Sequence, residues 1–177
     1  MSRVFFISDL HIGHKNVHTF RTQFSSEAEH REYIVDCWNS KVTKRDKVYV
    51  LGDAVFTMEG IATINSLHGS KTLIRGNHDN LDTTAYLKCF DQVEGMVKYK
   101  FFWLTHSPMH PVELRGKVNI HGHVHFATIN DIRYENVCCE NISYTPISYD
   151  ELINKRKERV KTFYGDEIYR YKYEKTD

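Results

Sequence analysis

The stretch RVFFIS (residues 3–8) is a short run of aromatic and β-branched residues that ends in a polar side chain. Two later stretches share its form, KVYVLGD (residues 47–53) and KTLIRGNHD (residues 71–79). Apolar runs of this length and composition, bounded by polar residues, are typical of buried strands. Segments with helical patterns lie between them. The order strand–helix–strand–helix–strand predicts parallel strands joined by right-handed crossovers.

The two segments between these strands carry apolar residues at helical spacing. The first covers about residues 26–42, with Ser25 or Ser26 as a candidate N-cap, and the second covers about residues 58–67. The apolar positions that define one face are Tyr33, Ile34, Cys37 and Trp38 in the first segment and Ile61, Ile64 and Leu67 in the second. We therefore expect both segments to pack on the sheet as helices.

The second half of the chain is richer in strand-forming residues and has short connections. Such runs cover residues 97–107, 116–125 and 128–143, which predicts a second, mixed sheet. Ser148 is followed three residues later by Glu151, a capping box that predicts a helix from there to about residue 163. We expect residues 1–177 to form one domain, with the tail after about residue 163 either a last strand or loosely ordered.

Composition indicates an ordinary globular protein. The chain has 177 residues, a hydrophobic content of 41% and a net charge of +1, so no global field attracts nucleic acid or an anionic membrane. No stretch is long enough for a signal peptide or a membrane span, and we expect a cytoplasmic protein without a membrane partner. The cysteines lack CxxC spacing and are predicted to be reduced thiols: Cys37, Cys89, Cys138 and Cys139.

The stretch NIHGHVH (residues 119–125) places histidines at three alternate positions, 121, 123 and 125. An extended backbone would send these side chains to one side, where they could converge on a metal ion. His123 and His125 are the stronger candidates. His121 is predicted either to support a ligand or simply to pack.

Polar side chains that can bind metals also follow the other strands. A carboxylate or an asparagine after a single strand is often a helix cap or part of a turn. Here five strand ends carry such residues, and seven candidates result: Asp9, His11, Asp53, Asn77, His106, His123 and His125. Carboxylates and imidazoles without thiolates suit Mn²⁺, Fe or Zn²⁺. Seven ligands are too many for one tetrahedral ion and suffice for two divalent ions that share a carboxylate.

With SDLH, GD, GNHD, THSP and HGHVH in this order, the sequence resembles the calcineurin-like metallophosphoesterase superfamily, and its ISDLHIGHKNV and TPISYDEL stretches resemble a small bacterial and phage branch. The resemblance implies an α/β fold of two facing mixed β-sheets flanked by helices. It further implies that Asp9, His11 and His125 hold one metal, that Asn77, His106 and His123 hold a second, and that Asp53 bridges the two. His78 is the implied catalytic residue outside the metal shell, and Arg75 the implied phosphate contact.

Three functions are compatible with these motifs. The leading hypothesis is hydrolysis of a small or nucleotide-like phosphodiester or phosphomonoester by a metal-bridging hydroxide, with Mn²⁺ preferred over Fe, Zn²⁺ or Ni²⁺. A nuclease acting on RNA or DNA ends is the alternative, and a non-catalytic metal-binding scaffold is a third. The basic run NKRKERVK (residues 154–161) is predicted to be a solvated helix face rather than a nucleic-acid patch.

Two further residues have alternative interpretations, and one loop has a single predicted role. His14 belongs either to an exposed turn or to a loop that lines the substrate pocket. Asp79 is expected to cap a helix, to bind His78, or both. The loop at residues 109–111 follows His106, where many relatives carry Gly-His and this chain has Thr-His, and we expect this loop to influence substrate choice.

Overall fold

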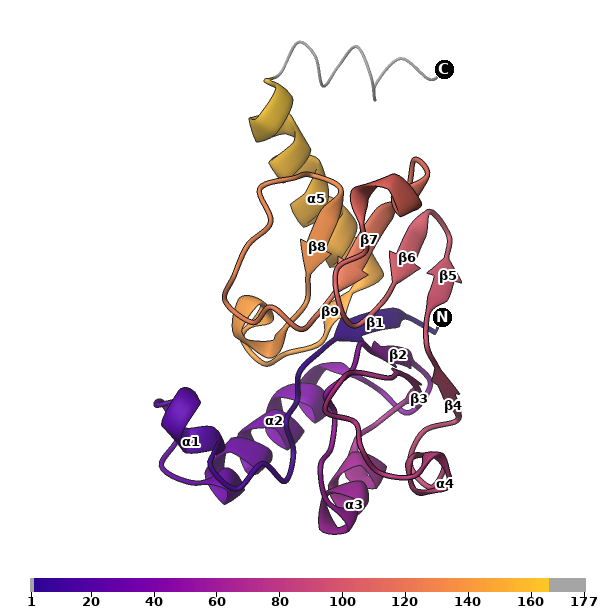
Figure 1. Ribbon diagram of the computed structural model, residues 1–177. Coiled ribbons are helices and arrows are strands. Elements are labelled where there is room, and N and C mark those ends of the chain that lie inside the picture. The colour runs from indigo at the N-terminus through magenta and orange to yellow at the C-terminus, as the bar shows by residue number, and fades with distance from the viewer. Residues whose placement is uncertain (1, 166–177) are drawn as a thin grey trace.

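Two mixed β-sheets form the body of the computed structural model, which describes residues 2–165 (Figure 1). The first sheet has the strand order β4-β3-β2-β1-β9. Its strands are β1 (Val4–Ile7), β2 (Lys47–Val50), β3 (Ser70–Ile74), β4 (Gln92–Glu94) and β9 (Ile147–Ser148). Strands β1 to β4 are parallel to their neighbours, and β9 is antiparallel to β1. The three strands predicted from the first half of the sequence, and their parallel pairing, are confirmed.

The second sheet has the order β5-β6-β7-β8 and faces the first (Figure 1). Its strands are β5 (Val97–Tyr99), β6 (Phe102–Leu104), β7 (Val118–His121) and β8 (Tyr134–Asn136). The pair β5–β6 is antiparallel, whereas β6–β7 and β7–β8 are parallel. The expected second, mixed sheet is therefore present.

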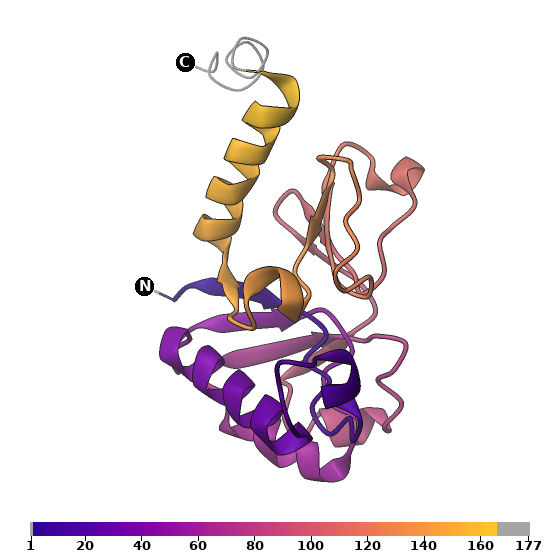
Figure 2. The same cartoon turned by 90° about the vertical axis from the view of Figure 1, so that its left-hand side faces the viewer.

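The helices flank the two sheets. They are α1 (Val17–Phe20), α2 (Glu27–Lys41), α3 (Met58–Ser66), α4 (Thr83–Tyr86) and α5 (Tyr149–Tyr164). Helices α1 to α4 lie on the outer face of the first sheet, while α5 and the second sheet rise from its other face (Figure 2). Within residues 2–165, no helix combines the length and apolar character that crossing a bilayer requires.

Strands β1, β2 and β3 of the first sheet are buried on both faces because their side chains alternate between two cores. Phe5 and Ile7 of β1 pack with the helices, whereas Phe6 between them packs against the second sheet. The helix-side core includes Ile34, Trp38, Ile61, Ile64, Val48, Val50 and Leu73. The core between the sheets includes Tyr49, Leu51, Ile74, Phe102, Leu104, Ile120 and, from α5, Leu152. Double burial explains the nearly continuous apolar runs of these strands.

Side-chain caps fix where the three longer helices begin. Ser26 accepts a hydrogen bond from the Glu29 amide at the start of α2, and Thr57 accepts one from the Gly60 amide at the start of α3. At α5 the capping box of Ser148 and Glu151 forms as predicted. Each bond satisfies an amide that the helix leaves without an intrahelical partner.

Two expectations about the second half require correction. Strand β7 ends at His121, so residues 122–125 form a loop and the three histidines do not share one extended segment. The basic run is only partly solvated. Arg156 and Arg159 turn toward β8 and bind the Glu135 carboxylate, while Lys155 and Lys157 are exposed.

Other outcomes concern thiols and short elements. The four cysteines are free thiols, as predicted. Helices α1 and α4, strands β4 and β9, and the 3-10 turns at Pro111–Leu114 and Cys139–Ile142 had no sequence signal, because two to four residues carry no periodicity. The tail beyond residue 165 lies outside the described residues.

Truncating Trp38 tests the helix-side core. Trp38 is fully buried and its Nε1 donates to the His68 carbonyl at 2.9 Å. We expect Trp38→Ala to lower the free energy of unfolding by about 3–5 kcal/mol, through lost burial and the cavity left behind. Urea unfolding measures this loss. Phe163→Ala, at a side chain that is 53% exposed on α5, is the matched control and should change the value by less than about 0.5 kcal/mol. Similar losses in both variants would contradict the assigned core.

Candidate metal centre

All seven predicted ligands lie at the edge where strands of the two sheets have their carboxyl ends close together. Asp9 and His11 follow β1, Asp53 follows β2 and Asn77 follows β3. From the second sheet, His106 follows β6, and His123 and His125 follow β7. Two groups of three side chains have ligand atoms within 4.8 Å of one another: Asp9, His11 and His125, and Asp9, Asp53 and His106. The structure thus brings together residues separated by more than a hundred positions.

The first cluster is built around an oxygen of Asp9 that has no hydrogen-bond partner. Asp9 Oδ1 lies 3.6 Å from His11 Nε2 and 3.7 Å from His125 Nε2, and both Asp9 Oδ1 and His11 Nε2 are buried without a partner within residues 2–165. These separations exceed a hydrogen bond. Two ligands bound about 2.1 Å from one cation lie about 3.0–3.4 Å apart, so the spacing is close to that of atoms around a shared ion.

The second cluster is centred on His106, where Asn77 and His123 lie beside the group already named. Its Nε2 lies 2.9 Å from Asn77 Oδ1, 3.2 Å from His123 Nδ1 and 3.5 Å from Asp53 Oδ1. Its Nδ1 lies 2.7 Å from the Leu51 carbonyl, which can only accept, so the ring proton belongs on Nδ1. The lone pair of Nε2 therefore faces the Asp53 carboxylate, an unfavourable contact that a cation between them would make favourable.

The two oxygens of Asp53 are directed toward different clusters. Oδ2 lies 3.8 Å from His11 Nε2, whereas Oδ1 lies 3.5 Å from His106 Nε2. Oδ1 also accepts a hydrogen bond of 2.9 Å from the His78 amide. A carboxylate in this position can contact two ions at once.

The ligands stand on strained backbone. Nine non-glycine residues among those described have positive φ, and five of them are predicted ligands: Asp9, His11, Asp53, His123 and His125. Each such conformation costs of the order of 1–3 kcal/mol, and strain of this kind concentrates at functional sites. Aspartate and histidine enter this region more readily than most residues, which fits the residue types found here.

Asp9 also fastens the two sheets together. Its Oδ2 accepts hydrogen bonds from Ser8 Oγ at 2.6 Å, from the His123 amide at 2.9 Å and from Cys138 Sγ at 3.2 Å. Burial raises the pKa of Asp9, but the interactions with His11, Ser8 and His123 outweigh it and hold the pKa well below its usual range. Gly122 makes this close approach possible, because a Cβ there would lie 1.9 Å from Ser8 Oγ.

A buried ion-pair network behind His125 was not predicted. His125 Nδ1 lies 3.0 Å from Glu140 Oε1, and the same oxygen accepts two hydrogen bonds from Arg21. Arg21 also donates to the carbonyls of Asp9 and Leu10. A carboxylate on one ring nitrogen orients a histidine and leaves the other nitrogen free for a metal. Nothing in FRT or CCENIS distinguishes Arg21 and Glu140 from ordinary surface charges.

This network shifts the pKa of its members. Burial raises the pKa of Glu140, but His125 and Arg21 outweigh it and lower the pKa to about 2, and the hydrogen bond with Glu140 in turn raises the pKa of His125. His30 lies against the same guanidinium, with Nε2 2.7 Å from Arg21. Burial and then the Arg21 charge lower the pKa of His30 to about 3.

Asp79 has a role other than those expected. Its carboxylate accepts hydrogen bonds of 2.8–2.9 Å from the backbone amides of Asp53, Ala54 and Gly76. It therefore fixes the two loops that carry Asp53 and Asn77. Asp82, not Asp79, caps α4. Arg75 donates to the Asp79 and Leu81 carbonyls and to Thr83, and its contact with phosphate stays a prediction.

A cavity of about 330 Å³ opens beside the first cluster. His78 and His14 line it together with His11 and His125. His14 therefore lies in a loop that lines a pocket, and its ring centroid is 6.0 Å from that of His11. This position suits the predicted substrate-binding role of His14, and that of His78 as a proton donor.

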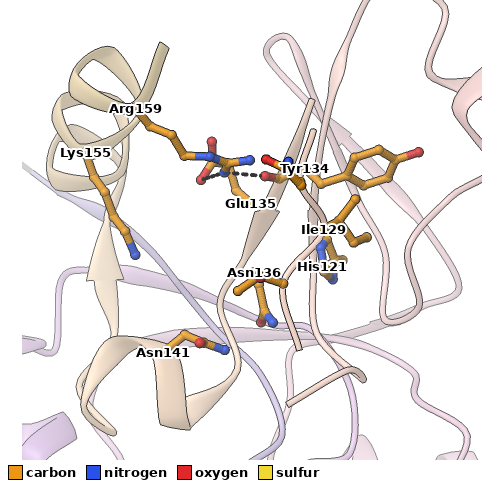
Figure 3. Close-up of a pocket in the computed structure, with 10 residues that line it drawn as sticks. His121, Ile129, Tyr134, Glu135, Asn136, Asn141, Lys155 and Arg159 are labelled. Atoms are coloured by element: carbon orange, nitrogen blue, oxygen red, sulfur yellow. Dashed lines mark hydrogen bonds and ion pairs between the residues drawn. The ribbon is translucent and has the colours of Figure 1, made fainter. Parts of the chain in front are cut away.

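His121 faces away from these clusters. It is 1% exposed, with Nδ1 2.9 Å from the Gly122 carbonyl, and burial lowers its pKa. It lines a second cavity of about 350 Å³ between β8 and α5, where Asn136, Asn141, Lys155 and Arg159 also lie (Figure 3). Asn136 and Asn141 each donate to the His125 carbonyl, so this cavity borders the back of the ligand loop.

The fold and the Asp/His clusters are those of metal-dependent phosphoesterases. The chain belongs to the calcineurin-like phosphoesterase family, whose model matches residues 2–173. It is 31% identical over 176 residues to an uncharacterized protein of Methanocaldococcus jannaschii (89% of this chain and 94% of that protein) and 32% identical over 162 residues to the gene 66 protein of Mycobacterium phage L5 (71% and 78%). The branch expected from the sequence thus includes an archaeal relative as well as a phage protein.

Two solved structures share the fold. A protein of unknown function from Aquifex aeolicus superposes with a TM-score of 0.72 at 24% identity, covering 87% of this chain and 99% of that one. The nuclease MPE of Pseudomonas putida gives a TM-score of 0.51 at 22% identity, covering 70% of this chain and 62% of that one. The expected α/β fold of two mixed sheets flanked by helices is confirmed.

Adding a methyl group at Gly122 tests the junction of the two sheets. In Gly122→Ala the Cβ would meet Ser8 Oγ and, at 2.4 Å, Asp9 Oδ2. We expect a loss of about 1–3 kcal/mol in the free energy of unfolding, measured by urea titration. Gly95→Ala is the control, since a Cβ there meets nothing within 4 Å. Equal stabilities of the two variants would show that the approach is looser than described.

The buried His30 predicts an acid-sensitive stability. Its pKa is about 3 in the folded protein against 6.5 for the ordinary side chain, so the unfolded chain binds one more proton between these values. Stability should fall as pH drops from 6.5 toward 3, by at most about 1.4 kcal/mol per pH unit from this residue. His30→Gln, whose amide oxygen can still accept from Arg21, should flatten this part of the curve of unfolding free energy against pH. The exposed His110→Gln is the control, and identical slopes in both variants would refute the assignment.

Proposed function

We propose that the protein is a binuclear metal-dependent phosphoesterase that hydrolyses small or nucleotide-like phosphodiesters or phosphomonoesters. The observation that carries this proposal is the pair of Asp/His clusters that share Asp9, with Asp53 directed at both. In this proposal Asp9, His11 and His125 hold one divalent ion and Asn77, His106 and His123 the other. Mn²⁺ is the preferred ion, because the ligands are oxygens and imidazoles without thiolates.

The residues present fit such ions. A buried carboxylate oxygen and a buried imidazole nitrogen without partners, Asp9 Oδ1 and His11 Nε2, are costly unless a cation satisfies them. His106 and His125 each direct one ring nitrogen at a fixed acceptor, the Leu51 carbonyl and Glu140, and the other at the cluster. This is the arrangement of histidines that bind metals.

The chain itself contributes orientation and a proton. Two divalent cations, when bound, neutralise phosphoryl oxygens and lower the pKa of a water that attacks phosphorus in line. Glu140 keeps His125 in one orientation, and Asp79 holds the loops of Asp53 and Asn77. His78 lines the cavity, where it can protonate the departing alcohol oxygen.

Cleavage of nucleic-acid ends is the second candidate, favoured by the likeness to a solved nuclease of the same fold. A polymer requires cations along its backbone, and the net charge is +1. The small substrate is therefore preferred. Cleavage that weakens steeply with ionic strength would instead favour the polymer.

The test is turnover of bis-p-nitrophenyl phosphate by protein loaded with Mn²⁺. We expect Asp53→Asn to abolish detectable turnover and His78→Ala to reduce kcat by about 10²–10⁴-fold, the usual contribution of a general acid. Asp36→Asn, at an exposed position on α2, should retain full turnover. An Asp53→Asn variant as active as the wild type would end the proposal.

A further inference from the structure

Two exposed phenylalanines lie at the mouth of the cavity beside the metal centre. Phe20 is 72% exposed and Phe126 is 68% exposed, the two most exposed aromatic side chains among residues 2–165. They come from different segments, since Phe20 ends α1 and Phe126 directly follows His125. Both line the cavity of about 330 Å³ that contains His11, His78 and His125. Exposed aromatic surface beside a functional site points to a ligand that covers it.

Aromatic contacts connect this surface to the metal ligands. The His14 ring meets Phe20 edge to face at a centroid distance of 5.9 Å and Phe56 at 5.6 Å. Phe56 in turn lies 5.0 Å from the ring of His11. Ring contacts therefore connect Phe20, through His14 and Phe56, to His11 of the first cluster.

The cavity offers little free positive charge. Arg21 is the one lysine or arginine among the described residues that line it, and its side chain is 3% exposed and bound to Glu140. A negatively charged group of a ligand would therefore bind at the Asp/His clusters, where the proposed cations balance its charge. The outer part of the ligand would contact the aromatic rings. A phosphate at one end and a flat aromatic group at the other fit this division.

We propose that Phe20 and Phe126 form an aromatic rim that holds the base of a nucleoside phosphate whose phosphate lies at the metal centre. This rests on the proposed function, because that function places the phosphate. Stacking on aromatic side chains tolerates every base, since each has a π-face. The rim therefore selects nucleotides over sugar phosphates and discriminates weakly among bases. The cavity volume lies at the lower end of the range of about 300–1,000 Å³ for small-molecule pockets.

The experiment compares adenosine 5′-monophosphate with ribose 5-phosphate, which lacks only the base. Their inhibition constants are measured against bis-p-nitrophenyl phosphate with the full-length protein in Mn²⁺, and calorimetry gives their dissociation constants independently of turnover. We expect the wild type to bind the nucleotide at least about tenfold more tightly, as stacking on one aromatic side chain implies. Phe20→Ala and Phe126→Ala should each reduce this ratio, and the double variant should bring it close to one without changing the affinity for ribose 5-phosphate.

Two controls separate stacking from folding. Phe20→Tyr and Phe126→Tyr keep the ring and should keep the ratio. Phe163→Ala removes an exposed ring that does not line the cavity and should also keep it. Equal binding of the two ligands by the wild type, or an unchanged ratio in the double alanine variant, would overturn the rim. The rim would also be overturned if an oligonucleotide bound far more tightly than the nucleotide, and did so only at low salt. Failure of the wild type to hydrolyse the reporter ester would contradict the proposed function, whereas the calorimetric ratio would still decide the rim.

Discussion

The carboxylate of Asp9 is buried where the two sheets meet, and its two oxygens have opposite environments. Oδ2 accepts three donors, one from its own strand end and two from the second half of the chain, while Oδ1 has no donor within residues 2–165. A buried charge is tolerated only when it is paired. The hydrogen bonds to Oδ2 explain why the sheets meet at this edge, and the unpaired Oδ1 makes the same edge a candidate cation site. Assembly of the fold and assembly of the site are therefore the same event.

Stability and function oppose each other around this point. Five predicted ligands have left-handed backbone, and the fold holds carboxylates and imidazoles close together at an electrostatic cost. The opposing support comes from groups that are fully satisfied. Asp79 accepts hydrogen bonds from three backbone amides, and Arg21 links Glu140 to the Asp9 and Leu10 carbonyls within the loop after β1. Such a surrounding layer keeps strained ligands in place and fixes which nitrogen of His125 faces the cluster.

The sequence was sufficient for the parts of the molecule that carry a period or a motif. The apolar runs of β1, β2 and β3 predicted strands that are buried on both faces, and the capping box at Ser148 predicted the start of α5. All seven predicted ligands meet because each follows a strand. The geometry of NIHGHVH was predicted wrongly, since close approach at Gly122 ends β7 and the turn, rather than the pleat, brings His123 and His125 inward. Arg21, Glu140 and the roles of Asp79 depend on contacts across 15 to 119 positions of the chain or on backbone amides, and no local pattern encodes either.

The bridge between Ser8 and Cys138 has a consequence for how the protein is made. The Ser8 amide donates to the Val137 carbonyl and the Cys139 amide donates to the Ser8 carbonyl, so this contact closes a very long loop of chain. Closure of distant segments follows local structure in folding. During synthesis the parallel strands and their crossovers can form early, while the polypeptide emerging from the ribosome still lacks His123 and His125. A nascent chain of that length presents an incomplete set of predicted ligands, so the candidate metal centre can form only after the segment that carries His123 and His125 has been translated.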